Sequence, residues 1–584
     1  MEPTANHPRF VRAASLAELP DGASRTVTLE GNVIALFNAG GKIFAVDNRC
    51  PHMGFPLDRG TVKDCILTCH WHHARFDLAT GGTFDQWADD VRAFPVKIEG
   101  GEVIVDLAEH RDLSRHYLAR LNDGLERDIP LVIAKSVIAL SARDEGGSLA
   151  TFRAGLDFGV AHRRDGWGAG LTTLTCMMNL LPSLDARDRQ RALYQGLSSV
   201  AADCDGNPPR FMVRPLPGAQ SASAAMLKGW LRSFVEVRDA EGAERCITSA
   251  VRAGVPAREV ADMMFAAATD HRYLSGGHVL DFTNKAFEAL DHAGSDRADA
   301  VLASLARSYA MADRMEEANA WRSPVDLVAI VERAFESIAD ALAAGRRAAG
   351  SWTGREGLAE VILGDDPQAV ADSMLAALRE GCSPADLGGA AAYAASMRIA
   401  RFHISNEFGD WDTAHHSYTF SNAVHQALRR APSVELIRGA FDAAMSVYLD
   451  RFLNVPATRI PRVSGAARPA AELIEALPSL LNLQQQVNEV AAVVAEYFGA
   501  PSSEGGRLIA AVGHAMLRED RDFHTIQDLE AAVRQYSMLP REAGANAMIS
   551  TARYLAAHSP TVRAQGQTYQ IAERLFRGDR LFEE

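Results

Sequence analysis

The residues whose types and spacing could do chemistry are two pairs of cysteine and histidine near the N-terminus. Cys50 and His52 form Cys-x-His, and after a gap of sixteen residues Cys69 and His72 form Cys-x-x-His. Thiolates and imidazoles bind transition metals, so a tetrahedral zinc site is one interpretation. Zinc-finger halves usually present like pairs, whereas each half here is mixed. An iron–sulfur centre is therefore the favoured interpretation.

The two pairs and their flanks resemble the ligand loops of a Rieske [2Fe–2S] domain. Residues 48–49 before the first pair, and segments 74–77 and 80–82 after the second, are similar to Rieske loop and strand sequence. The resemblance implies that the two cysteines bind one iron of the cluster and the two histidines bind the other. It also implies one-electron transfer, because neutral imidazoles in place of two thiolates make the cluster easier to reduce.

The resemblance is to the lower-potential Rieske type found in bacterial ferredoxins and ring-hydroxylating oxygenases. Respiratory Rieske proteins carry an extra, disulfide-forming cysteine in each ligand loop, and those positions are apolar or aromatic here, Trp71 included. His73 stands where such loops usually have glycine. Cys65, four residues before Cys69, is expected to be a small buried strand residue. We expect His52 or His72 to form the exposed edge for electron transfer.

Composition bounds the class of protein. The chain has 584 residues, a net charge of −14 and 47% hydrophobic residues, as in a globular protein without the basic surface that nucleic acid needs. Seven cysteines without a pairing pattern predict a reducing compartment and no disulfide framework. We find no signal peptide and no apolar stretch long enough to span a membrane. We therefore expect a cytoplasmic protein with no nucleic-acid partner.

The predicted fold class is α+β multidomain: a small antiparallel β Rieske domain, then a large all-α domain with an internal repeat. Glycine-punctuated extended segments are expected at 27–29, 32–37, 42–47, 65–68, 75–77 and 102–106. After Leu107 apolar residues recur at helical spacing. We expect five segments: 1–108 the Rieske domain, 109–235 a helical linker and first helical segment, 236–350 and 351–460 the two helical repeats, and 461–584 a C-terminal helical segment.

The repeat is defined by histidine, phenylalanine and asparagine at equal spacing. His278, Phe282 and Asn284 match His416, Phe420 and Asn422, with an insertion of about eleven residues before His416 and a weak third echo at Phe523-His524. Two histidines and a carboxylate with open positions are typical of non-haem iron. Candidate catalytic residues are His278, His415 and His416, followed by His271, Asp281 and His524.

Three interpretations of these residues stay open: a second metal site, contact with an organic molecule without metal, and a structural role. Residues 415–423 and 441–453 also resemble the questin oxidase-like helical family, which implies oxidation of a cyclic organic molecule. No Gly-x-Gly-x-x-Gly follows a predicted strand, so we expect an external ferredoxin or reductase as electron donor.

Two hypotheses on function follow. In the first, the protein is an enzyme that accepts electrons at a [2Fe–2S] cluster and delivers them to the oxidation of a hydrophobic or cyclic organic substrate in the helical domain, with O₂ as the candidate oxidant. In the alternative, it is a redox-responsive electron carrier or binding protein whose helical domain docks a partner and has no catalytic site. The sequence leaves the substrate, the donor and the oligomeric state open.

Overall fold

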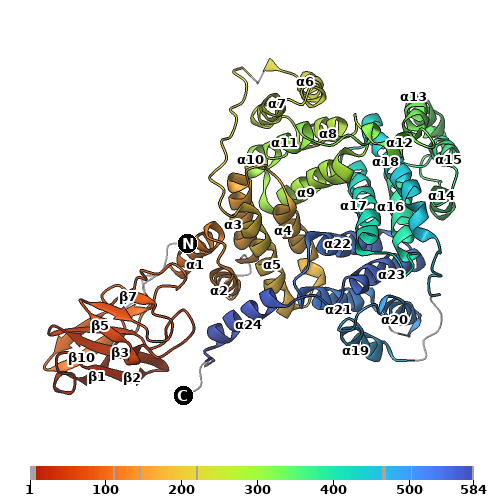
Figure 1. Cartoon of the computed structure of the whole chain (residues 1–584). Coiled ribbons are helices and arrows are strands. Elements are labelled where there is room, and N and C mark those ends of the chain that lie inside the picture. The colour runs from red at the N-terminus through yellow and green to blue at the C-terminus, as the bar shows by residue number, and fades with distance from the viewer. Residues whose placement is uncertain are drawn as a thin grey trace. The chain divides into compact units, whose positions relative to one another are not determined.

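The computed structural model of the chain describes residues 8–109, 112–143, 147–218, 221–462, 468–501, 503–579 and 581 (Figure 1). Its elements form two compact units. We call Met1–Ala154 together with Gln565–Glu584 the β unit, and Gly155–Ala564 the helical unit. The predicted fold class is confirmed, since a small antiparallel β domain precedes a large helical region. The division into five segments stays a prediction.

The strands of the β unit form three antiparallel sheets. One has the order β1-β10-β9, with β1 at Phe10–Ser15, β10 at Glu102–Asp106 and β9 at Val96–Glu99. The central sheet has the order β2-β3-β4-β8, at Ser24–Leu29, Asn32–Ala39, Lys42–Asp47 and Ala93–Phe94. The third has the order β5-β6-β7, at Thr61–Lys63, Ile66–Thr68 and Arg75–Asp77. Each predicted extended segment overlaps one of these strands.

Four hairpins of the β unit turn through two residues. The turn residues are 30–31, 40–41, 64–65 and 100–101, and all have positive φ. Turns of this kind match the right-handed twist of the strands they join. Cys65 therefore lies exposed in a turn, and the expectation of a small buried strand residue is wrong. The other three turns contain glycine and were predicted from it, whereas the turn at Asp64-Cys65 contains no glycine.

The central sheet buries both of its faces. In β3, Ala35 and Phe37 pack in one cluster with Leu67, Phe76 and the loop cysteines. Ile34 and Leu36 point the other way and pack with residues of β10. Alternate strand residues face opposite sides, so a run of apolar residues in β3 serves both clusters. One face of the central sheet thus packs against the two cysteine-bearing loops.

Three helices complete the β unit: α1 (Leu113–Glu126), α2 (Pro130–Ser141) and α24 (Ala564–Arg577). Arg120 of α1 donates hydrogen bonds to the carbonyls of Gln86 (2.9 Å) and Ala88 (2.8 Å). Arg49 donates to the carbonyls of Leu575 (2.9 Å) and Asp579 (2.7 Å). Residues from both ends of the chain therefore build one unit.

Helix α3 (Gly147–His162) runs from the β unit into the helical unit. The first helices that follow are α4 (Ala169–Leu180), α5 (Ala186–Cys204), α6 (Ala224–Glu236), α7 (Ala240–Arg252), α8 (Ala257–Ala268), α9 (His278–Ala293), α10 (Ala298–Ala303), α11 (Ala306–Ala310), α12 (Asn319–Arg322) and α13 (Leu327–Gly345). The remainder are α14 (Arg355–Ile362), α15 (Pro367–Arg379), α16 (Pro384–Ala400), α17 (Phe408–Arg430), α18 (Val434–Leu449), α19 (Ala470–Leu480), α20 (Val487–Gly499), α21 (Gly505–Leu517), α22 (Phe523–Met538) and α23 (Arg541–Ala557).

The predicted repeat corresponds to two three-helix runs, α7-α8-α9 and α15-α16-α17. In each, the first two helices are joined by a short turn containing a left-handed glycine, Gly254 (φ 75°) or Gly381 (φ 92°). The third helices differ in length, because α9 begins at His278 with 16 residues whereas α17 begins at Phe408 with 23. The insertion before His416 therefore extends α17 at its N-terminus, and α9 packs directly on α17.

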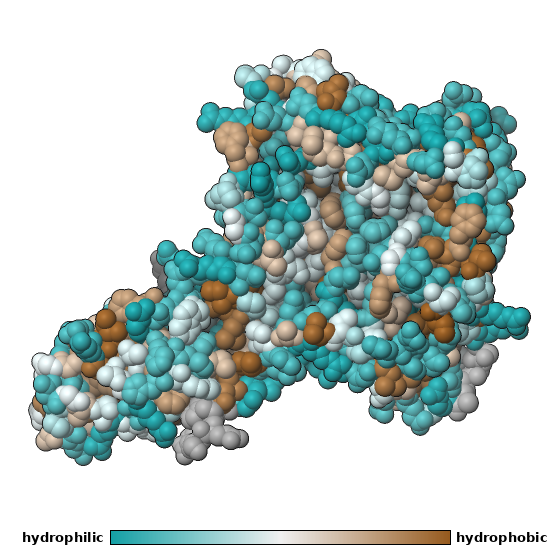
Figure 2. Space-filling model, in the orientation of Figure 1, coloured by the Kyte–Doolittle hydropathy of each residue, from teal (hydrophilic) through white to brown (hydrophobic). Residues whose placement is uncertain are grey.

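Hydrophilic residues predominate on the face shown in Figure 2, with hydrophobic ones in single positions or small groups. Among the described residues, no helix is both long and apolar enough to cross a membrane.

Candidate metal centres

The two cysteine-bearing loops of the β unit have the same backbone pattern. Each cysteine N–H donates to the carbonyl of the fifth residue after it, at 2.8 Å for both Cys50 and Cys69. Each cysteine carbonyl accepts from the fourth residue, Gly54 at 2.7 Å and His73 at 3.0 Å. Gly54 (φ 83°) and His73 (φ 64°) are both left-handed. His73 therefore takes the conformation that glycine usually supplies there.

The two sulfurs face one another in a buried, hydrogen-bonding environment. Cys50 and Cys69 are 2% and 1% exposed. The backbone N–H groups of the second and third residues after each cysteine donate to its sulfur. A hydrogen bond between the two thiols raises the pKa of Cys50 and lowers that of Cys69 to about 6. These donors stabilise thiolates, the form in which cysteine binds metal.

The two imidazoles of the loops lie beside one another. The rings of His52 and His72 have centroids 4.8 Å apart, and each packs against a tryptophan, Trp87 (4.6 Å) and Trp71 (4.4 Å). Burial, followed by the charge of Lys135, lowers the pKa of His52 to about 4. Its Nδ1 atom is buried without a hydrogen-bond partner. The residues present therefore fit a [2Fe–2S] cluster, which needs two thiolates and two neutral imidazoles.

His72 is exposed, while His52 is half-buried. Of the two candidates for an exposed edge, His72 is therefore the more accessible.

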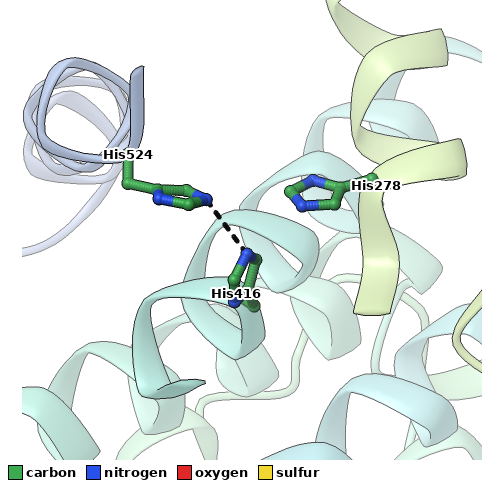
Figure 3. A group of neighbouring side chains, drawn as sticks. All are labelled: His278, His416 and His524. Carbon is green, nitrogen blue, oxygen red and sulfur yellow. Dashed lines mark hydrogen bonds between the residues drawn. The ribbon is translucent and has the colours of Figure 1, made fainter. Parts of the chain in front are cut away.

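A second group of chemically capable residues lies in the helical unit. His278 of α9, His416 of α17 and His524 of α22 each offer one nitrogen within 4.8 Å of the others. Figure 3 shows the three rings turned toward one another, and His416 and His524 are joined through their Nε2 atoms at 3.1 Å. We call these three residues the histidine trio. Of the six predicted catalytic candidates, the structure brings these three together.

Burial is the main cause that lowers the pKa of all three rings, to about 3 for His278 and about 4 for His416 and His524. The rings are therefore neutral near pH 7, as metal binding requires. Within the described parts of the chain, the trio is the one group of three or more potential ligands this close together, and it has no carboxylate.

The other candidates lie outside the trio. His415 is fully buried and its ring nitrogens make no hydrogen bond, although Nδ1 lies 3.6 Å from a carboxylate oxygen of Asp528; its ring is 5.0 Å from that of His524. His271 hydrogen-bonds Glu316 at 2.6 Å. Asp281, three residues after His278, accepts a hydrogen bond from Gln527 instead of joining the trio. The expected group of two histidines and a carboxylate is therefore replaced by three histidines.

A cavity of about 620 Å³ opens beside the trio. His278 and His416 form part of its wall, together with the rings of Tyr273, Trp321, Tyr448 and Phe452. Asp450 lines it too, accepting a hydrogen bond from Ser417 at 2.6 Å, and burial raises the pKa of this carboxyl to about 7. The cavity thus combines aromatic walls with one carboxyl whose pKa lies near neutrality.

The loop before His278 is held in an uncommon conformation. Tyr273 (φ 45°), Ser275 (φ 49°) and the two glycines that follow are left-handed. A Cβ atom on Gly277 would lie 2.7 Å from Cβ of Phe420, so glycine permits the close approach of α9 and α17 there. Left-handed residues other than glycine cost energy and often occur at functional sites.

The sheet order, the paired loops and the thiolate–imidazole group define a Rieske-type electron-transfer domain. Residues 9–95 match the family model of the Rieske [2Fe-2S] domain, and the chain therefore belongs to the proteins that carry this domain.

Relatives of this domain include ferredoxin components of dioxygenase systems. The ferredoxin component of the naphthalene 1,2-dioxygenase system of Pseudomonas aeruginosa is 35% identical over 101 residues, which cover 17% of this chain and 97% of that protein. The 3-phenylpropionate/cinnamic acid dioxygenase ferredoxin subunit of Escherichia coli (strain K12) is also 35% identical over 101 residues, 17% of this chain and 94% of that protein. A solved structure, Sphingomonas yanoikuyae B1 ferredoxin, is 31% identical and covers 17% of this chain and 98% of its own, with a TM-score of 0.16.

The β domain is thus homologous to electron-transfer ferredoxins and implies a [2Fe–2S] cluster. These similarities cover about a sixth of the chain, so any function of the helical unit is inferred from its own residues. Sequence reasoning missed Trp87 and Lys135, which contact the first ligand loop without belonging to a motif.

Proposed function

We propose that this protein is a Rieske oxidoreductase in which the β unit accepts electrons and the helical unit uses them to oxidise a hydrophobic or cyclic organic substrate. Cys50, His52, Cys69 and His72 are the proposed cluster ligands. When bound, a [2Fe–2S] cluster takes up and releases one electron at a time. The proposed electron donor is an external ferredoxin or reductase.

The roles of the chain around the cluster follow from contacts in the β unit. The backbone N–H groups that donate to the two cysteine sulfurs stabilise negative charge there. The apolar cluster under the loops excludes water from the buried side. The exposed ring of His72 offers the edge at which a donor or acceptor can approach.

The histidine trio is proposed to hold a second iron ion. Three neutral imidazoles from three helices suit iron, as well as zinc, copper or nickel, and leave coordination positions open. When bound, iron would supply those open positions for oxygen. The trio holds the metal, and the cavity beside it admits the substrate.

One observation carries this part of the proposal: two of the three trio residues also line a cavity of about 620 Å³ with aromatic walls. That volume lies in the range of small-molecule sites. Its rings favour an apolar, cyclic ligand. Because the pKa of Asp450 is raised to about 7, the protonated fraction of its carboxyl can donate a hydrogen bond to a substrate oxygen. Oxygen as the oxidant stays part of the proposal.

The deciding experiment is to measure iron and acid-labile sulfide per chain in anaerobically purified protein, together with the spectrum of the reduced state. We expect two sulfides and three irons, with a Rieske-type spectrum. His524→Ala should lose the extra iron alone. His271→Ala, at a candidate outside the trio, should keep it. Equal iron and sulfide in the unaltered protein would contradict a second iron site.

The second candidate function is a redox-responsive electron carrier or binding protein, without a catalytic site in the helical unit. It is favoured by the fact that the two relatives reported above are ferredoxin components, covered over 97% and 94% of their length by the β domain alone. Equal iron and sulfide, together with full function in His278→Ala and His416→Ala, would support it.

A further inference from the structure

A lysine from outside the matched Rieske domain reaches the first ligand loop. Lys135 lies on α2, forty residues beyond the end of the matched segment 9–95. Its Nζ donates hydrogen bonds to the carbonyls of Pro51 and, at 2.9 Å, His52. These are the two residues that follow Cys50, so the contact is to the loop itself.

Among the described residues, no carboxylate forms an ion pair with the ammonium of Lys135. None of the ion pairs between described residues includes it. The nearby Asp89 instead pairs with Arg120 at 3.1 Å and with His116 at 3.2 Å. Arg49 and Arg120 add further positive charge around Lys135, and Asp89 and Cys50 add the negative charge that acts on it.

We propose that Lys135 is a positioning residue that fixes the first ligand loop and raises the reduction potential of the cluster. Reduction adds one negative charge to the cluster, and a fixed positive charge nearby stabilises that product. The two hydrogen bonds also hold the peptides on either side of His52, and so orient its ring. This inference rests on the proposed ligand assignment.

The proposal gives the helical extension of the β unit a role in electron transfer. Helix α2 holds Lys135 against the first ligand loop. Hydrogen bonds and charges around an iron–sulfur cluster change its reduction potential. A Rieske domain that ends at residue 95 would lack this cation. The potential of this protein should therefore depend on residues that a domain-level comparison leaves out.

The test is a redox titration of the full-length protein, followed by the spectrum of the reduced cluster, in Lys135→Met, Lys135→Gln and Lys135→Arg. At the midpoint potential of the unaltered protein, Lys135→Met should lower the reduced-to-oxidised ratio by about tenfold, which corresponds to about 59 mV for one electron. Lys135→Arg should restore most of the shift. Lys135→Gln, which can donate without charge, should fall between.

Lys63→Met is the matched control, because it removes the same charge from an exposed residue of β5. Its reduced-to-oxidised ratio should change less than about twofold, since exposed charges are screened. Iron and sulfide are measured on every variant. A fully loaded Lys135→Met or Lys135→Gln with the unaltered potential would overturn the proposal. Absence of the cluster from the unaltered protein would instead overturn the ligand assignment.

Discussion

The two candidate centres of this chain are built in opposite ways. In the β unit the proposed ligands lie on two short loops within residues 50–72, and both loops repeat one hydrogen-bond pattern. In the helical unit the histidine trio spans residues 278–524 and comes from three separate helices. The first centre is therefore specified by local sequence, whereas the second exists only after the helices have packed.

The donor sets differ in the same way. Two thiolates and two imidazoles on the loops of a Rieske domain imply an iron–sulfur cluster, while imidazoles alone accept several transition metals. The residues of the β unit thus imply a particular cofactor, whereas the donor set of the helical unit is compatible with several metals. The following predictions test whether the two centres are as separate as this contrast implies.

The largest expected effect is on the loop-borne centre. Cys69→Ala should abolish bound sulfide and the spectrum of the reduced cluster, because no other residue can replace a buried thiolate at that position. The trio should keep its metal. Cys65→Ala, an exposed cysteine in a neighbouring turn, is the control and should leave both centres unchanged. Loss of both metals in Cys69→Ala would show that the centres depend on one another.

The next effect is on the trio. His416→Ala should weaken binding of the second metal by at least about 100-fold, since even residues that only orient a ligand change affinity by about 10–100-fold. Competition with a coloured chelator measures the affinity. His403→Ala, at a half-buried histidine before α17 that lies outside the trio, should keep full affinity. Retained metal in His416→Ala would separate the trio from metal binding, leaving the cluster of the β unit as the one centre.

A smaller effect is expected on the cavity beside the trio. Trp321→Ala should weaken binding of the apolar fluorophore 8-anilinonaphthalene-1-sulfonate about tenfold, because a tryptophan ring supplies a large apolar contact area. Phe211→Ala, which is 84% exposed, should have no effect. Equal binding by both variants would place the apolar site elsewhere on the molecule.

The smallest effect concerns a buried carboxyl near the trio. Burial raises the pKa of Asp528 to about 7, so the folded protein keeps a proton that the unfolded chain releases at its ordinary pKa. The carboxyl therefore costs stability increasingly as the pH rises from about 4 to about 7. Asp528→Asn should gain stability over that range, by at most about 1.4 kcal/mol for each pH unit. Thermal unfolding followed by helical circular dichroism at pH 5 and pH 8 measures this gain; a pH-independent difference would show that Asp528 ionises normally.

The sequence predicted the Rieske domain and its two ligand loops, and it predicted the grouping of the trio only in part. The cysteine and histidine pairs, and the glycines of three hairpins, act through neighbours in the chain, so their pattern is visible. His278 and His416 were visible through the repeat. His524 appeared only as a weak echo, because its partners lie on α9 and α17, far away in sequence.

The errors have physical causes as well. Helical spacing predicted that Asp281 lies beside His278. That spacing gives no information on Gln527, whose side chain donates a hydrogen bond to the carboxylate of Asp281. Cys65 was placed in a strand because its turn contains no glycine, although both turn residues adopt positive φ. The two errors thus come from a long-range contact and from a turn without glycine, neither of which is visible in the local sequence pattern.

The contact of Arg49 with the carbonyls of Leu575 and Asp579 bears on how the protein is made. A ribosome produces the ligand loops first and α24 last. With more than 400 residues between α2 and α24, the delay is roughly tens of seconds at ordinary rates of synthesis. During that interval the nascent first loop lacks its C-terminal covering, so cluster insertion can precede the final closure of the unit that holds it.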